Sequence, residues 1–144
     1  MTYESKGASS ATTSPASPPN LSPATLAHEI GDLILEKKGV DLQVIDVEQV
    51  TTIADFLVLA TGASGRQVKA IASEIREHVK SQGGKIVSDA GLDEGWWVCL
   101  DLGDVVVHLM QDDARQYYDL ESFWADGQVV RRAAVPSDDD SEEV

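Results

Sequence analysis

Two short runs of alternating residues, 96–101 and 104–110, flank a tight turn at Leu102-Gly103 and constrain the fold most. The alternation predicts an antiparallel β-hairpin. One face of this hairpin is wholly apolar, so it must pack on a core and belong to a larger sheet. Its residues are Trp96, Val98, Leu100, Val105, Val107 and Leu109. A two-residue turn predicts the register in which Trp97 lies opposite His108 and Asp101 lies opposite Asp104.

The other face of the hairpin is mixed and has no obvious covering element. Two carboxylates that face each other are destabilising when buried, so Asp101 and Asp104 should reach water or a cationic partner. Beyond these two carboxylates at the turn, the same face carries Trp97, Cys99, Val106, His108 and Met110.

The rest of the sequence alternates between helical and strand patterns. Helices are expected from Ser22-Pro23 to a stop at Gly39, from a capping box at Ser64 and Gln67 to Gly83-Gly84, and from 112 or 113 through Trp124. Strands are expected at 41–47, at 55–61, where a continuous apolar run indicates burial on both faces, and over a short stretch at 85–88. The order predicts an α/β or α+β fold, with about five strands in a mixed sheet flanked by helices.

The ends of the chain differ from its middle. Residues 1–21 are rich in Ser, Thr and Pro and are expected to form a disordered arm. Residues 133–144 are expected to form an acidic, disordered tail. One domain should therefore occupy residues 22–132.

The charge of the chain limits its partners. The net charge is −14 and the pI about 4.3, which argues against direct binding of nucleic acid and favours a basic protein. Residues 86–126 hold ten acidic residues and a single basic one, Arg115. The acids surround several aromatic side chains, and a charged rim around an aromatic centre is typical of protein interfaces.

Catalytic and metal sites find little support. The TGASGR segment at 61–66 could cradle a phosphate, but it is better explained as a strand-to-helix turn. Asp101, Asp104, His108 and Asp112 are too far apart along extended strands to share one metal, and no Asp-x-Asp pair occurs in the apolar strands. Neither a metal nor a cofactor is expected. A single cysteine and the lack of a long apolar run indicate a reducing compartment and no membrane span.

Three segments together resemble the Iojap-like ribosomal silencing factors: ADFLVLATGASGRQVKAIA, WWVCLDLGDVVVHLM and ARQYYDLESFW. The resemblance covers roughly residues 24–124. It implies a nucleotidyltransferase-like fold without the catalytic carboxylates, and hence no enzyme. It also implies binding to the large ribosomal subunit through its protein number fourteen. That binding would block joining of the small subunit and repress translation when nutrients or energy are short.

The resemblance also implies a set of contact residues. Gly103 should be needed for the turn, and Trp124 should belong to the core. The residues that match the family's partner-binding positions are Trp97, Asp101, Asp104, His108, Met110, Tyr118 and Glu121. A bacterial cytoplasmic location is expected, with a plastid as the alternative. A homodimer of the free protein is compatible with the sequence. A role in large-subunit assembly remains open, and a nucleotidyltransferase-like enzyme is the more distant alternative.

Overall fold

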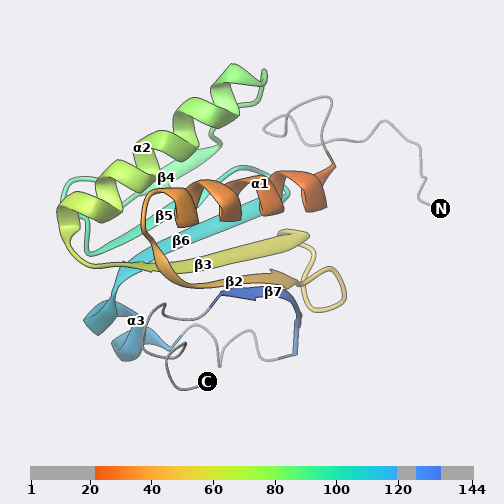
Figure 1. The fold of residues 1–144 in the computed structure, drawn as a ribbon. Helices are drawn as coiled ribbons and strands as arrows, with labels where there is room; N and C mark the ends of the chain where they lie inside the picture. The colour runs from red at the N-terminus through yellow and green to blue at the C-terminus, as the bar shows by residue number, and fades with distance from the viewer. Residues whose placement is uncertain (1–21, 120–125, 134–144) are drawn as a thin grey trace, which may run out of the picture.

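The structure is a computed structural model and describes residues 22–119 and 126–133. Its helices are α1 (Pro23–Glu36), α2 (Gly65–Ser81) and α3 (Asp112–Tyr118), and its strands are β2 (Val40–Asp46), β3 (Phe56–Gly62), β4 (Ser88–Ala90), β5 (Trp97–Asp101), β6 (Val105–Gln111) and β7 (Gln128–Ala133). The strands form one sheet in the order β4-β5-β6-β3-β2-β7. Helices α1 and α2 cover one face of this sheet, and α3 lies at the end of β6 (Figure 1).

The mixed sheet is confirmed. Strands β3 and β6 are parallel, whereas the other four neighbouring pairs are antiparallel. The sheet has six strands in the described residues rather than about five, because β7 adds to the edge beside β2. Strand β7 has the sequence QVVRRA and mostly exposed side chains, so it lacks the alternation that predicts a strand.

The main core lies between the sheet and the two long helices. Strand β3 is buried along its whole length, as its continuous apolar run predicts. Its inward-facing residues meet the apolar stripes of α1 and α2, and the apolar face of the hairpin joins them. The predicted core face of the hairpin is therefore confirmed: Val98, Leu100, Val105, Val107 and Leu109 are all buried.

The N-caps predicted at Ser22 and Ser64 are present, whereas the cap expected at 112 or 113 is not. The Ser22 hydroxyl accepts from the Thr25 N–H, and the Ser64 hydroxyl accepts from the Gln67 N–H. The Gln67 side chain does not close the usual capping box on Ser64. Instead its oxygen accepts from the Ala63 N–H, and its nitrogen donates to the carbonyls of Lys37 and Lys38. Gln67 thus joins the start of α2 to the end of α1.

The end of α1 differs from the prediction. Lys38, rather than Gly39, adopts the left-handed conformation, with φ of 72°. The Gly39 N–H still donates to the Ile34 carbonyl. A Cβ at Gly39 would collide with the Ile34 side chain, so this glycine is required for close approach.

The hairpin register predicted from the sequence is wrong by two residues. Trp97 lies opposite Met110, Cys99 opposite His108, and Asp101 opposite Val106 rather than Asp104. A two-residue turn was expected, but the strands separate over 102–104. The Leu102 side chain is buried, its N–H donates to the Val105 carbonyl, and the strand pairing therefore starts later. A shift of two keeps every side chain of β5 and β6 on its predicted face.

Two further elements differ in extent. The short strand β4 begins at Ser88, the last residue of the predicted 85–88. Helix α3 begins after Gln111, which caps it without a side-chain hydrogen bond, and it ends at Tyr118 because Asp119 is left-handed, with φ of 50°. The predicted continuation through Leu120 to Trp124 lies outside the described residues.

We expect Gly103→Ala to destabilise the domain by about 1–2 kcal/mol, because Gly103 has φ of 97° and a Cβ is unfavourable there. Urea denaturation measures the change in the free energy of unfolding. Gly84→Ala is the control, because Gly84 does not have a positive φ. Equal effects of the two substitutions would contradict the proposed role of Gly103.

Candidate protein-interaction surface

The second face of the sheet carries a smaller apolar cluster. Residues of β2, β3, β6 and α3 form it, with half-buried aromatic and aliphatic side chains at its edge. Met110 lies inside this cluster and has no exposed area. It was predicted to contact a partner. Because it faces Leu59, Ala114 and their neighbours, it instead supports the surface from below.

Trp97 and His108 form the polar centre of this face. The Trp97 indole nitrogen donates to His108 Nδ1 over 3.0 Å, and the two rings lie 5.8 Å apart, centroid to centroid. Burial lowers the pKa of His108 from 6.5 to about 4, so its imidazole is neutral near pH 7. The structure therefore brings together two of the predicted partner-binding residues, from adjacent strands.

Trp96 was predicted to lie on the core face, and this prediction is wrong. It precedes the first residue of β5 and is half-buried beside the smaller cluster. Its indole nitrogen donates to Asp113 Oδ1 over 3.0 Å, and its ring lies 6.5 Å from that of Tyr117. Tyr117 is 75% exposed. The alternation could not reveal this, because Trp96 stands where the strand pattern ends.

Acidic side chains gather around the turn of the hairpin. The Asp101 carboxylate accepts from the Gly103 N–H over 2.9 Å, and the Asp104 carbonyl accepts from the N–H of Asp55 and Phe56. Burial, followed by the neighbouring charges of Asp104 and Asp46, raises the pKa of Asp55. The smaller part of this shift, which comes from the charges of Asp104 and Asp46, reflects a negative potential that a cationic partner would relieve.

Arg115 positions α3. It is only 5% exposed, and its guanidinium donates to the Asp41 carbonyl over 2.7 Å and to the Thr61 hydroxyl over 2.9 Å. These bonds tie the helix to β2 and β3. The sequence showed Arg115 only as the single base of an acidic segment, whereas the structure makes it an internal support.

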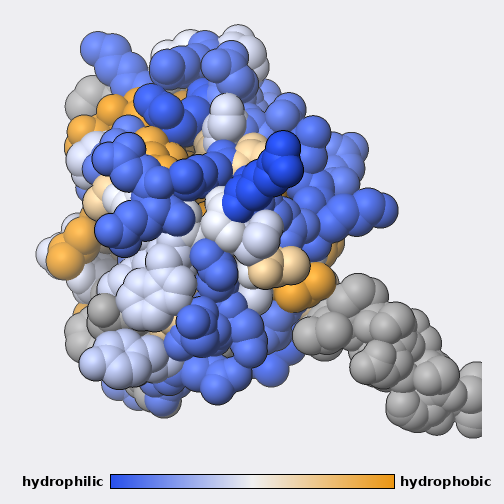
Figure 2. All heavy atoms as spheres, turned by 90° about the vertical axis from the view of Figure 1, so that its left-hand side faces the viewer, coloured by the Kyte–Doolittle hydropathy of each residue, from blue (hydrophilic) through white to orange (hydrophobic). Residues whose placement is uncertain are grey.

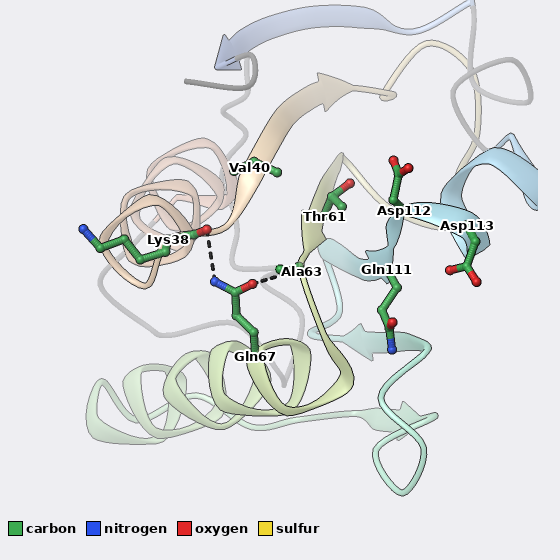
Figure 3. A pocket seen from close by; sticks show the side chains of 9 residues that line it. Lys38, Val40, Thr61, Ala63, Gln67, Gln111, Asp112 and Asp113 are labelled. Carbon is green, nitrogen blue, oxygen red and sulfur yellow. Dashed lines mark hydrogen bonds between the residues drawn. The ribbon is translucent and has the colours of Figure 1, made fainter. Parts of the chain in front are cut away.

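A hollow of about 710 Å³ lies where β3 ends and α2 begins. Figure 3 shows Thr61, Ala63 and Gln67 on one side of it and Gln111, Asp112 and Asp113 on the other. Gln67 spans the turn through its hydrogen bonds, so the TGASGR segment forms the strand-to-helix turn that was expected. Among residues 22–119 and 126–133, no group of three His, Cys, Asp or Glu side chains could hold a metal ion.

The surface at the α3 end is largely hydrophilic, with apolar side chains mainly at the margins (Figure 2). Two of the predicted contact residues lie at or beyond the end of α3. Tyr118 is the last residue of α3, and Glu121 lies outside the described residues. Within the described part of the chain, no helix has the length and apolar character needed to cross a bilayer.

The fold and this surface define a class: a small α+β domain whose sheet has one helix-covered face and one partly open, aromatic and acidic face. A crystal structure of a Chromobacterium violaceum protein is similar, with a TM-score of 0.71 and 34% identity over 82% of this chain and 98% of that one. A Bacillus halodurans structure is also similar, with a TM-score of 0.64 and 34% identity over 75% of this chain and 95% of that one.

The family profile described as "Ribosomal silencing factor during starvation" matches residues 19–144, and the chain belongs to this family. It is 41% identical to ribosomal silencing factor RsfS of Bacillus subtilis over 63% of this chain and 77% of that protein. It is 30% identical to the chloroplastic protein Iojap of Arabidopsis thaliana, over 81% of this chain and 47% of that one. The predicted family and fold class are thereby confirmed.

Acidification is expected to destabilise the fold through His108. Its pKa is about 4 in the folded chain and about 6.5 in the unfolded chain, so the unfolded chain binds the proton more tightly. Stability from the neutral ring is complete above pH 6.5 and is lost as the pH falls towards 4, by roughly 2–3 kcal/mol. Urea denaturation at several pH values measures this loss. His108→Gln should show a smaller pH dependence, and an unchanged one would contradict the assignment.

We expect Arg115→Met to lower the free energy of unfolding by roughly 1–3 kcal/mol, because the Asp41 carbonyl and the Thr61 hydroxyl lose a buried donor. Hydrogen exchange of the α3 amides should accelerate at the same time. Arg132→Met is the matched control, since Arg132 is exposed on β7. If α3 exchanged at the same rate in both variants, Arg115 would not be its anchor.

Proposed function

We propose that this protein binds the large ribosomal subunit through the subunit's protein number fourteen and blocks joining of the small subunit. The consequence is repression of translation when nutrients or energy are limiting. Membership of the silencing-factor family supports this proposal. Its action is steric, and the chain acts as a binding protein rather than as an enzyme.

The contact surface proposed for this role is the open face around Trp97 and His108. The observation that carries it is the hydrogen-bonded pair of these two side chains at the edge of the smaller cluster, beside the acidic turn. An aromatic centre supplies contact area with little loss of side-chain entropy, and the acidic rim selects a basic partner. Asp101, Asp104, Tyr118 and Glu121 belong to the proposed rim.

The bacterial relatives favour a bacterial cytoplasmic protein as the setting for this function. The plastid alternative is supported by the chloroplastic Iojap proteins of Arabidopsis thaliana and Zea mays, which are 30% and 34% identical to this chain.

A second candidate function is assembly of the large subunit. The chain is 30% identical, over 74% of its length, to a mouse protein named "Mitochondrial assembly of ribosomal large subunit protein 1", and it spans 50% of that protein. Assembly and silencing can use the same contact on the large subunit. They differ in whether joining of mature subunits responds to the protein.

We expect Trp97→Ala to abolish inhibition of subunit joining. Purified large and small subunits are mixed with wild-type or variant protein, and the joined fraction is read by sedimentation. Wild-type protein should reduce joining, and the variant should bind large subunits at least tenfold more weakly, as removal of a central aromatic residue costs more than about 1.4 kcal/mol at many interfaces.

Ile53→Ala is the matched control, because Ile53 is an exposed apolar residue of the β2–β3 connection, with 74% of its area accessible. It should inhibit joining as well as the wild type. Binding without any effect on joining would favour the assembly role. Failure of the wild-type protein to bind large subunits would contradict both functions.

A further inference from the structure

The hydrogen bond between Trp97 and His108 determines where the imidazole carries its proton. An indole nitrogen can only donate, so His108 Nδ1 must accept, over 3.0 Å, and cannot be protonated. A neutral imidazole has one N–H group. The proton therefore resides on Nε2, the nitrogen farther from the backbone.

The Nε2–H group has no acceptor among the residues that the structure describes. His108 is half-buried, and Nε2 is not among the fully buried polar atoms that lack a partner. Its neighbours across the sheet are Cys99 on β5 and Leu59 on β3, and neither backbone position turns a carbonyl towards the open face. Within residues 22–119 and 126–133, this donor therefore reaches the surface without a protein acceptor.

We propose that His108 is a preorganised hydrogen-bond donor, held by Trp97, that recognises an uncharged acceptor oxygen at the centre of a basic protein surface. This inference rests on the proposed function and specifies its chemistry. Free imidazole exists as two tautomers, and the indole selects one before the partner arrives. Trp97 is thus a positioning residue as well as a source of contact area.

The surrounding charge indicates which oxygen this donor meets. Asp101 lies on the same face as His108, two residues from Cys99 along β5, and Asp104 follows at the turn. A carboxylate or phosphate brought to His108 would be repelled by these acids. A backbone carbonyl or a side-chain amide oxygen would not, and basic side chains around it would pair with the acids.

The tautomer is measurable in the free, full-length chain. Long-range proton–nitrogen NMR spectra of ¹⁵N-histidine-labelled protein distinguish the two ring nitrogens. The chain has three histidines, and the His108 signals are those missing from His108→Gln. We expect a protonated Nε2 and an unprotonated Nδ1 at pH 7. Trp97→Phe keeps an aromatic ring without the N–H, and it should produce a mixture of tautomers.

Two substitutions of His108 distinguish the contributions of Nδ1 and Nε2 to binding. Binding is measured with isolated large subunits. Asparagine can still accept from the Trp97 N–H but cannot reach the position of Nε2, whereas glutamine can place an amide N–H there. We expect His108→Gln to bind within about threefold of wild type, and His108→Asn to bind roughly tenfold more weakly, the scale of an acceptor left without a donor. Thermal unfolding confirms that both variants are folded.

A protonated Nδ1 in the wild-type spectrum would overturn the inference, and so would equal binding by the Gln and Asn variants. The predicted tautomer together with weaker binding by the Asn variant alone would support it. If wild-type protein bound no large subunits, the proposed function and the partner assigned to this donor would both fall. The NMR result would still decide whether Trp97 holds the imidazole in one tautomer.

Discussion

The parallel pairing of β3 with β6 is the constraint on which the rest of the structure depends. Phe56 to Gly62 align with Val105 to Gln111 without a break, so the buried central strand meets the hairpin along its full length. Parallel strands need a crossover connection, and α2 supplies it on the face that α1 also covers. Once this pairing exists, the apolar side of the hairpin must face the helices and its mixed side must face away from them.

The division into two unequal faces explains how a small domain can be stable and still offer a contact surface. The helix-covered face holds most of the buried apolar residues. The second face has only a small cluster, closed at one end by α3, which Arg115 anchors to β2 and β3. Trp97 and His108 can therefore stay half-buried at this face without loss of the main core. In the proposed function, a neutral histidine within an acidic surrounding supplies one specific donor, and the acids favour a basic partner.

The sequence analysis succeeded where a pattern is local and failed where an outcome depends on contacts between distant segments. Ser22 and Ser64 were recognised as caps because a cap requires only residues three positions apart. The hairpin register was wrong because burial of Leu102 decides where the turn ends. Met110 was predicted at the surface because strand alternation cannot show that α3 folds over the end of β6.

The sequence by itself determined the mixed α+β class, the buried central strand, the faces of strands β5 and β6, and the family, since each depends on periodicity or on a local string of residues. Only the tertiary structure decided the edge strand β7, the support role of Arg115 and the pairing of Trp97 with His108. The physical reason is that alternation specifies the face on which a side chain lies. The neighbour that it meets there depends on strand register, which is set by packing elsewhere in the sheet.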